Sequence, residues 1–182
     1  GTDYGTVGTP KAVCMDDRFV WLADANPSDG SRRISRLFWG GFTLDKSFNP
    51  ASPAGNDICR GLAADRVRLF RVNYDAPFIA SCRKGWPFTD IRTYVPVDNS
   101  PMAIAVGRDD VYTIEYPSGG GCDLVVRPRD GFTPETARIS LPAEFVGTGI
   151  AIDGTFIYVV GHTNIGPFLC IYHRDRLLVN DA

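Results

Sequence analysis

The sequence predicts an all-β fold, a four-bladed β-propeller of four-stranded antiparallel blades, and three observations favour this prediction. The composition combines 19 Gly and 13 Pro with 18 Asp against 3 Glu and 16 Arg against 3 Lys, so turn-forming residues abound and good helix formers are scarce. A strand–turn–strand pattern recurs four times along the chain. A second pattern recurs in phase with the first.

The first pattern aligns four segments without gaps. Their starts are separated by 49, 42 and 46 positions, and the segments are Cys14–Trp21, Ala63–Phe70, Ala105–Tyr112 and Ala151–Tyr158. Each segment runs from a small residue through an apolar residue and a polar turn to an apolar–aromatic pair, which is typical of a strand, a hairpin and a second strand. The small residues suit innermost strands that crowd around a central axis.

The second pattern is Phe-Thr, at Phe42, Phe88 and Phe132, with spacings of 46 and 44 positions. A third apolar run lies between the two patterns in every unit, and a fourth run follows the second pattern in most of them. Four short strands per repeat of this length indicate propeller blades. We therefore expect a single domain over 1–182, with blades at roughly 8–52, 53–98, 99–144 and 145–182.

The fourth unit lacks the Phe-Thr pattern, so its outermost strand is open to two interpretations. It is either the tail Arg176–Ala182 or the N-terminal segment Asp3–Val7, which would close the ring and remove exposed sheet edges. The tail is the slightly favoured of the two. In a further alternative the chain provides four blades of a larger, partly missing propeller.

Two stretches carry a resemblance to known proteins. The segment Asp153–Val160 resembles blades of propellers that bear a Tyr-Val-Thr-Asn signature, and Pro101–Val106 looks like their innermost strand. The count of four blades is similar to that of hemopexin-like domains, but Cys14 and Cys170 fall in strands at different radii, so that family's disulfide is not carried over. The resemblance implies an architecture and no single function, because such propellers serve as scaffolds, binders and occasional enzymes.

Charge and hydropathy exclude some functions. The net charge of −2 lacks the basic footprint of a nucleic-acid binder, and no apolar run has the length of a membrane span. The opening Gly1-Thr2-Asp3 does not resemble a signal peptide. The compartment stays open, with extracellular and virion-associated locations included. The five cysteines lack zinc-site spacing, and most follow apolar runs, so buried thiols are favoured over disulfides.

Strand order sorts the loops onto two faces. The first face is expected to be acidic. It holds the weak catalytic candidates His162, Glu115 and Asp75, which would act by general acid–base chemistry, and the binding candidates Tyr74 and Tyr116 beside Asp75 and His162. Loop carboxylates can also attract Ca²⁺, although the chain has no contiguous calcium-loop motif, so no cofactor is predicted firmly.

The second face is expected to be mixed in charge and rich in Arg, with hairpin aspartates that serve turn geometry. Trp39 and Trp86 occupy equivalent places in their units and either stack on a glycan or pack between blades. Because no complete catalytic constellation is present, the leading hypothesis is a non-catalytic binding or assembly module that binds a protein partner through one face. The alternatives are a lyase or hydrolase near His162 and a carbohydrate-binding lectin.

Overall fold

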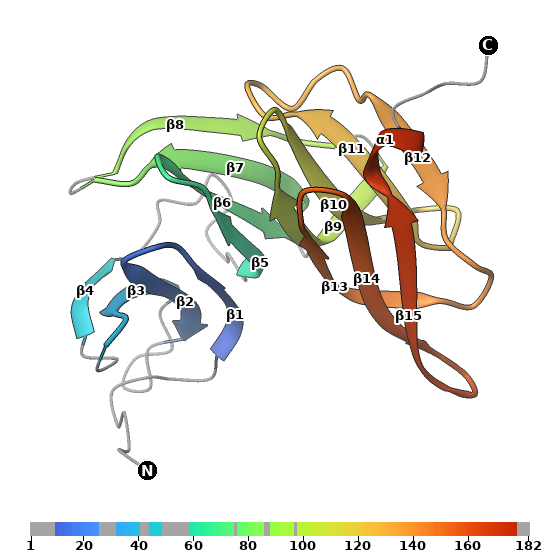
Figure 1. The fold of residues 1–182 in the computed structure, drawn as a ribbon, viewed down its shortest axis with the longest axis horizontal. Coiled ribbons are helices and arrows are strands. Elements are labelled where there is room, and N and C mark those ends of the chain that lie inside the picture. The colour runs from blue at the N-terminus through green and yellow to red at the C-terminus, as the bar shows by residue number, and fades with distance from the viewer. Residues whose placement is uncertain are drawn as a thin grey trace.

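The computed structural model describes residues 10–25, 32–40, 44–48, 59–74, 76–85, 88–96 and 98–177. In these ranges the chain forms four antiparallel sheets and one short helix (Figure 1). The all-β prediction is therefore confirmed. No helix in the described ranges has the length and apolar character needed to cross a membrane.

Each sheet is a meander in which strands pair only with their neighbours along the chain. Sheet A contains β1 (Pro10–Met15), β2 (Phe19–Ala25), β3 (Arg32–Phe38) and β4 (Leu44–Phe48). Sheet B contains β5 (Cys59–Ala64), β6 (Arg68–Asn73), β7 (Phe78–Arg83) and β8 (Thr89–Tyr94). Sheet C contains β9 (Asn99–Val106), β10 (Asp110–Pro117), β11 (Asp123–Pro128) and β12 (Ala137–Ser140). Sheet D contains β13 (Val146–Ile152), β14 (Phe156–Thr163) and β15 (Gly166–His173).

A β-bulge recurs in the innermost strand of every sheet. The pairing of the first two strands skips one residue each time, and the skipped residues are Lys11, Arg60, Met102 and Thr148. These four positions keep the spacings of 49, 42 and 46 that separate the sequence repeats. The same backbone irregularity therefore recurs at equivalent positions of the four units. A bulge bends its strand and increases the local twist.

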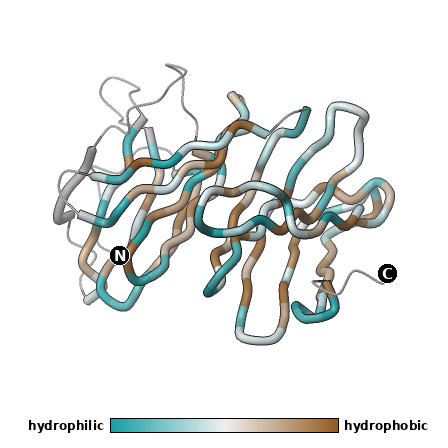
Figure 2. The backbone as a smooth tube through the Cα atoms, turned by 90° about the horizontal axis from the view of Figure 1, so that it is seen from above, coloured by the Kyte–Doolittle hydropathy of each residue, from teal (hydrophilic) through white to brown (hydrophobic). Residues whose placement is uncertain are grey.

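Three hydrophobic clusters lie between successive sheets, and alternation along the strands divides the residues among them. The cluster between sheets A and B is built from Trp21, Ala23, Ile34, Cys59, Leu62 and Leu69. The cluster between B and C is built from Ala63, Phe70, Val72, Ile79, Ile104, Val111 and Phe132. The cluster between C and D includes Tyr112, Ile114, Leu124, Val126, Ile157, Val159 and Cys170. Figure 2 shows the hydrophobic residues along the strands and the hydrophilic ones mostly at the loops.

Innermost strands approach one another closely. A Cβ atom on Gly61 of β5 would lie 2.9 Å from the Cα of Ala103 and 3.0 Å from the backbone nitrogen of Ile104, both in β9. Any side chain at this position would displace backbone, so glycine is required. The crowding expected around an axis is therefore present between sheets B and C.

The sheets follow one another in an arc, which is compatible with propeller architecture (Figure 1). Strand β1 packs along β5, β5 along β9, and β9 along β13. Among the described residues no comparable packing joins β13 back to β1. A ring closed within one chain is therefore not confirmed.

The C-terminal segment departs from the prediction of an outer strand. Residues Arg174–Leu177 form the one-turn helix α1, so the first two residues of the expected strand, Arg176 and Leu177, are helical. Within the described residues sheet D has three strands, and β15 is its edge. The segment Asp3–Val7 lies outside the described residues.

The five cysteines, all of them within the described residues, form no disulfide. Burial raises the pKa of the Cys14 thiol far above its usual range, and it raises the pKa of Cys82 to about 11. Thiols in such surroundings stay protonated and behave as small apolar side chains.

Candidate functional site

In sheets A, B and D an aspartate shapes the β-hairpin that joins the first and second strands, and in sheet C Gly107 occupies the same position. In sheet A, Oδ1 of Asp16 accepts hydrogen bonds from the backbone N–H groups of Arg18 (2.9 Å) and Phe19 (2.8 Å). Asp65 makes the same pair of bonds in sheet B, both at 2.6 Å, and Asp153 makes them in sheet D, both at 2.7 Å. These aspartates thus serve turn geometry, as expected from the sequence.

The second oxygen of the aspartate is available to the aromatic residue five positions later. Trp21 donates its indole N–H to Oδ2 of Asp16 at 2.9 Å, and Tyr158 donates its hydroxyl to Oδ2 of Asp153 at 2.7 Å. The equivalent residue in sheet B is Phe70, which has no donor, and Oδ2 of Asp65 accepts instead from Arg129 at 3.5 Å. In sheets A and D the aromatic residue of the repeat therefore also holds the hairpin aspartate.

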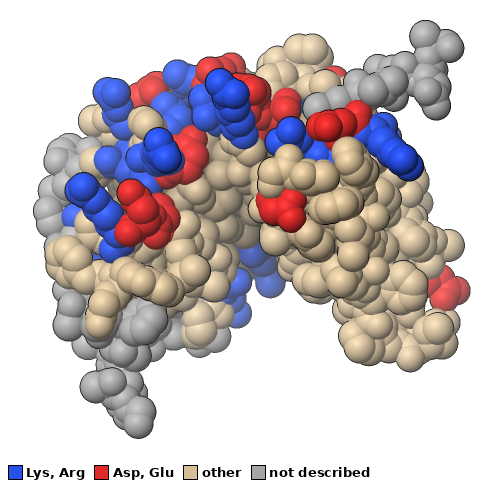
Figure 3. Space-filling view, viewed as in Figure 1, with Lys and Arg blue, Asp and Glu red and all other residues tan. Residues whose placement is uncertain are grey.

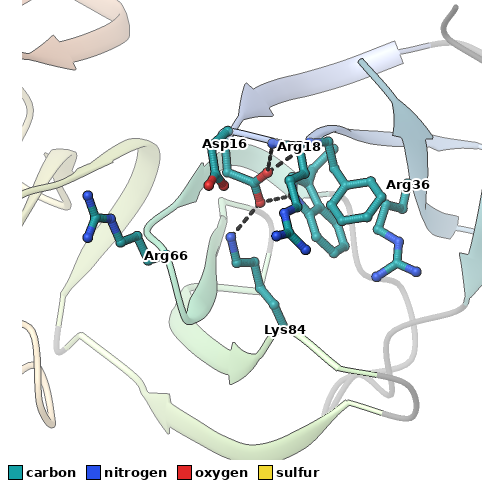
Figure 4. Close-up of a pocket in the computed structure, with 8 residues that line it drawn as sticks. Asp16, Arg18, Arg36, Arg66 and Lys84 are labelled. Carbon is teal, nitrogen blue, oxygen red and sulfur yellow. Dashed lines mark hydrogen bonds and ion pairs between the residues drawn. The ribbon is translucent and has the colours of Figure 1, made fainter. Parts of the chain in front are cut away.

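A pocket of about 350 Å³ opens where the first hairpin meets sheet B (Figure 4). Its walls come from two successive sheets, and the lining residues Asp16 and Lys84 are 68 positions apart in sequence. Sheet A contributes Asp16, Asp17, Arg18, Phe19, Trp21 and Arg36, and sheet B contributes Arg66 and Lys84. In Figure 4 Arg18 and Lys84 lie centrally beneath Asp16, while Arg66 and Arg36 lie on either side.

The carboxylate of Asp16 is fully engaged. Besides Trp21 and the two backbone donors, it forms an ion pair with the ammonium group of Lys84, and the side chains of this pair are only 6% and 10% exposed. Burial by itself would raise the pKa of Asp16, but the hydrogen bonds from Lys84, Trp21 and the backbone outweigh it and lower that pKa below its usual value. The carboxylate thus remains ionised and holds Lys84 in place.

Besides Lys84, the pocket is lined by three arginines, Arg18, Arg36 and Arg66. The guanidinium of Arg36 lies 4.3 Å from the ring centroid of Phe19 and 5.6 Å from that of Trp21, a cation–π arrangement. Arg18 and Arg66 are exposed, and their guanidinium groups have no ion-pair or hydrogen-bond partner within the described residues. Four basic and two acidic side chains line the pocket, and one of the acids is already neutralised by Lys84. The arrangement is suited to bind an anionic group.

The predicted catalytic candidates are not brought together. Glu115 is completely buried in sheet C, where it pairs with the guanidinium of Arg127 at 3.0 Å and accepts a hydrogen bond from Thr113 at 2.7 Å. His162 is exposed on β14, and Asp75 lies outside the described residues. The expectation that Glu115 lines an open mouth is therefore wrong, because Arg127 holds it in the interior of the sheet.

The binding candidates have a mixed outcome. Tyr74 and Tyr116 lie together, with ring centroids 5.9 Å apart in an edge-to-face arrangement, and the hydroxyl of Tyr116 donates to the carbonyl of Gly147 at 2.8 Å. Burial raises the pKa of Tyr116 well above its usual range. Trp39 is exposed at the end of β3, and Trp86 lies outside the described residues. Whether either tryptophan binds a glycan stays a prediction.

Arginines offset the acidic residues of the first face. Asp24 pairs with Arg33 at 2.9 Å, and Asp123 pairs with Arg138 at 2.7 Å. The charges of these two carboxylates are therefore offset by arginines. Among the described residues no group of three His, Cys, Asp or Glu side chains is placed to hold a metal ion.

Comparisons with known proteins extend to the fold only. No family model and no curated protein matches the chain. Among solved structures it is similar to a chain from a structural and mechanistic analysis of two prolyl endopeptidases, with a TM-score of 0.57 and 11% sequence identity. The likeness covers 87% of this chain and 24% of that one, so this chain spans about a quarter of its neighbour's length. Because the neighbour has a β-propeller domain, the fold and the likeness together define an all-β protein of propeller-like architecture.

Proposed function

We propose that this chain is a non-catalytic binding module that holds an acidic segment of a protein partner in the pocket between sheets A and B. The observation that carries the proposal is that four basic side chains line one pocket, beside a carboxylate that already accepts four hydrogen bonds. An anion entering this pocket meets cationic donors, while the repulsion from Asp16 is offset by Lys84.

The chemistry of the pocket favours a carboxylate side chain. Arg18 and Arg66 present planar guanidinium groups, which match a carboxylate with two parallel hydrogen bonds. The rings of Phe19 and Trp21 offer an apolar wall for the methylene groups of a glutamate, and Arg36 covers that wall with a further charge. Because the pocket is open to solvent, we expect modest affinity and a strong dependence on ionic strength.

Isothermal titration with hexaglutamate tests the proposal, with hexalysine as the oppositely charged probe. Hexaglutamate is expected to bind, and each of Arg18→Gln and Arg66→Gln is expected to weaken it about fivefold. Raising the salt concentration is expected to weaken binding further, because the contacts involve exposed charges.

Arg108→Gln is the matched control, since Arg108 is an exposed arginine in the corresponding hairpin of sheet C and lies outside the pocket. The proposal fails if hexaglutamate does not bind. It also fails if Arg108→Gln weakens binding as much as the two pocket variants, because the effect would then reflect overall charge.

The enzyme alternative is supported only by the likeness to prolyl endopeptidases. If it holds, the purified chain cleaves a proline-containing peptide, and His162→Ala abolishes the cleavage. We expect no cleavage, because Glu115 is engaged by Arg127 and is not available beside His162.

A further inference from the structure

The outer face of sheet D is apolar and uncovered by any described residue. Successive side chains of β14 and β15 point to opposite faces of the sheet. On one face, Ile157, Val159 and Cys170 pack against sheet C. The opposite face carries Phe156, Tyr158, Val160, Leu169 and Ile171, and the cross-strand pairs Tyr158–Ile171 and Val160–Leu169 form a continuous apolar ladder on it.

The extent of exposure on this face is unusual. Leu169 is 52% exposed and Ile171 is 56% exposed, although both residues lie in β15, which pairs with β14. In Figure 3 the part of the molecule over β13–β15 is almost free of charged side chains, whereas the charged residues gather along the upper margin. Contiguous apolar surface of this kind marks an interaction site.

The repeat identifies what kind of surface would cover this face. The last residue of the strand–turn–strand pattern is Trp21, Phe70, Tyr112 or Tyr158 in the four sheets. Trp21 packs toward sheet B, Phe70 toward sheet C and Tyr112 toward sheet D. Tyr158 occupies the same position and faces outward. Sheet D therefore presents the surface with which sheets A, B and C each contact the following sheet.

The opposite end of the arc presents the complementary surface. The residue before that aromatic packs toward the preceding sheet, as Leu69, Val111 and Ile157 do. Its counterpart in sheet A is Val20, which is buried at 7% exposure, whereas Val13 (60% exposed) and Met15 (55% exposed) lie on the same face of β1. Along β1, sheet A therefore presents part of the surface with which sheets B, C and D each contact the sheet before them.

We propose that two copies of this chain associate head to tail, so that the outer face of sheet D in one copy packs on the outer face of sheet A in its partner. Two such identical contacts related by a twofold axis close a ring of eight sheets. Propellers of four to about eight blades are known, and head-to-tail contacts form closed rings when the rotation permits. The contact continues the packing that already joins A to B, B to C and C to D, and it covers the exposed apolar side chains of β1 and the apolar ladder of sheet D.

Sedimentation velocity of the purified chain tests the proposal. We expect a species of twice the 19.9 kDa mass of the chain. Ile171→Lys places a charge in the contact on the sheet D side and Val13→Lys places one on the sheet A side, and each is expected to weaken association about a hundredfold. Ile165→Lys is the matched control, because Ile165 is 89% exposed at the β14–β15 turn, outside the ladder.

Mixing the two variants separates the head-to-tail contact from a symmetric one. A mixture of Ile171→Lys and Val13→Lys retains one intact pair of faces, so we expect association to return in the mixture although each variant alone is monomeric. If two sheet D faces packed on each other instead, Val13→Lys alone would still dimerise. A monomeric wild-type chain, or a Val13→Lys variant that dimerises normally, overturns the proposal. Far-UV circular dichroism of each variant confirms that it is folded.

Discussion

The first and last hairpins of the chain contain the same aspartate in different surroundings. Asp16 and Asp153 both accept two backbone N–H groups and one aromatic donor. Asp16 also receives Lys84 from sheet B, whereas Asp153 lies in the last sheet of the arc and is exposed. The comparison teaches that the repeat determines the turn, while the neighbouring sheet determines whether the turn becomes part of a pocket.

Removing the first aspartate is expected to have the largest effect on this comparison. Asp16→Ala deletes the hairpin bonds and leaves the ammonium of Lys84, 10% exposed, without its partner, so we expect a loss of about 2 kcal/mol in the free energy of unfolding. Asp153→Ala deletes the equivalent bonds but leaves no buried cation without its partner, so we expect a clearly smaller loss in the free energy of unfolding. Urea denaturation of both variants measures the difference.

Asp17→Ala is the control for this pair, because Asp17 is an exposed carboxylate in the same turn as Asp16. Its unfolding midpoint is expected to match that of the wild type. Equal losses in Asp16→Ala and Asp153→Ala would show that the ion pair with Lys84 adds nothing to the turn.

The effect of pH sharpens the same contrast. The pKa of Asp16 is lower in the folded chain than its ordinary value of 3.8, so its stabilising contribution is fully present above that value and is lost as the pH falls through the folded pKa. We therefore expect Asp16→Asn to be less stable than the wild type at pH 7, and the gap to narrow below pH 3.8. Urea midpoints measured from pH 2 to 7 test this, and a gap that stays constant over the range would contradict it.

The smallest expected effect concerns the hairpin without an aromatic donor. Phe70→Tyr supplies sheet B with the hydroxyl that Tyr158 uses toward Asp153, and it is expected to change the free energy of unfolding by no more than about 1 kcal/mol. Phe70→Leu, which removes ring volume from a fully buried site beside Phe132, is expected to cost more. If both variants lose equal stability, Asp65 does not accept the new hydroxyl.

Local features were predictable from the sequence because they depend on residues close together along the chain. The hairpins, their aspartates and the strand pairs all follow from the spacing of small, polar and aromatic residues.

Contacts between distant segments were not predictable in this way. Lys84 reaches Asp16 across 68 positions, and nothing in either segment marks the pairing. Glu115 looked like a loop carboxylate, yet the arginine that buries it lies on the next strand of the same sheet. Both depend on side-chain reach across a sheet or between sheets, which a periodic pattern does not encode.

The meander topology has a consequence for how such a chain changes over evolutionary time. Because each described strand pairs only with its neighbours in sequence, each sheet completes its own hydrogen-bonded ladder, and no ladder joins successive sheets. Duplication or loss of one 42- to 49-residue unit therefore breaks no hydrogen-bonded ladder.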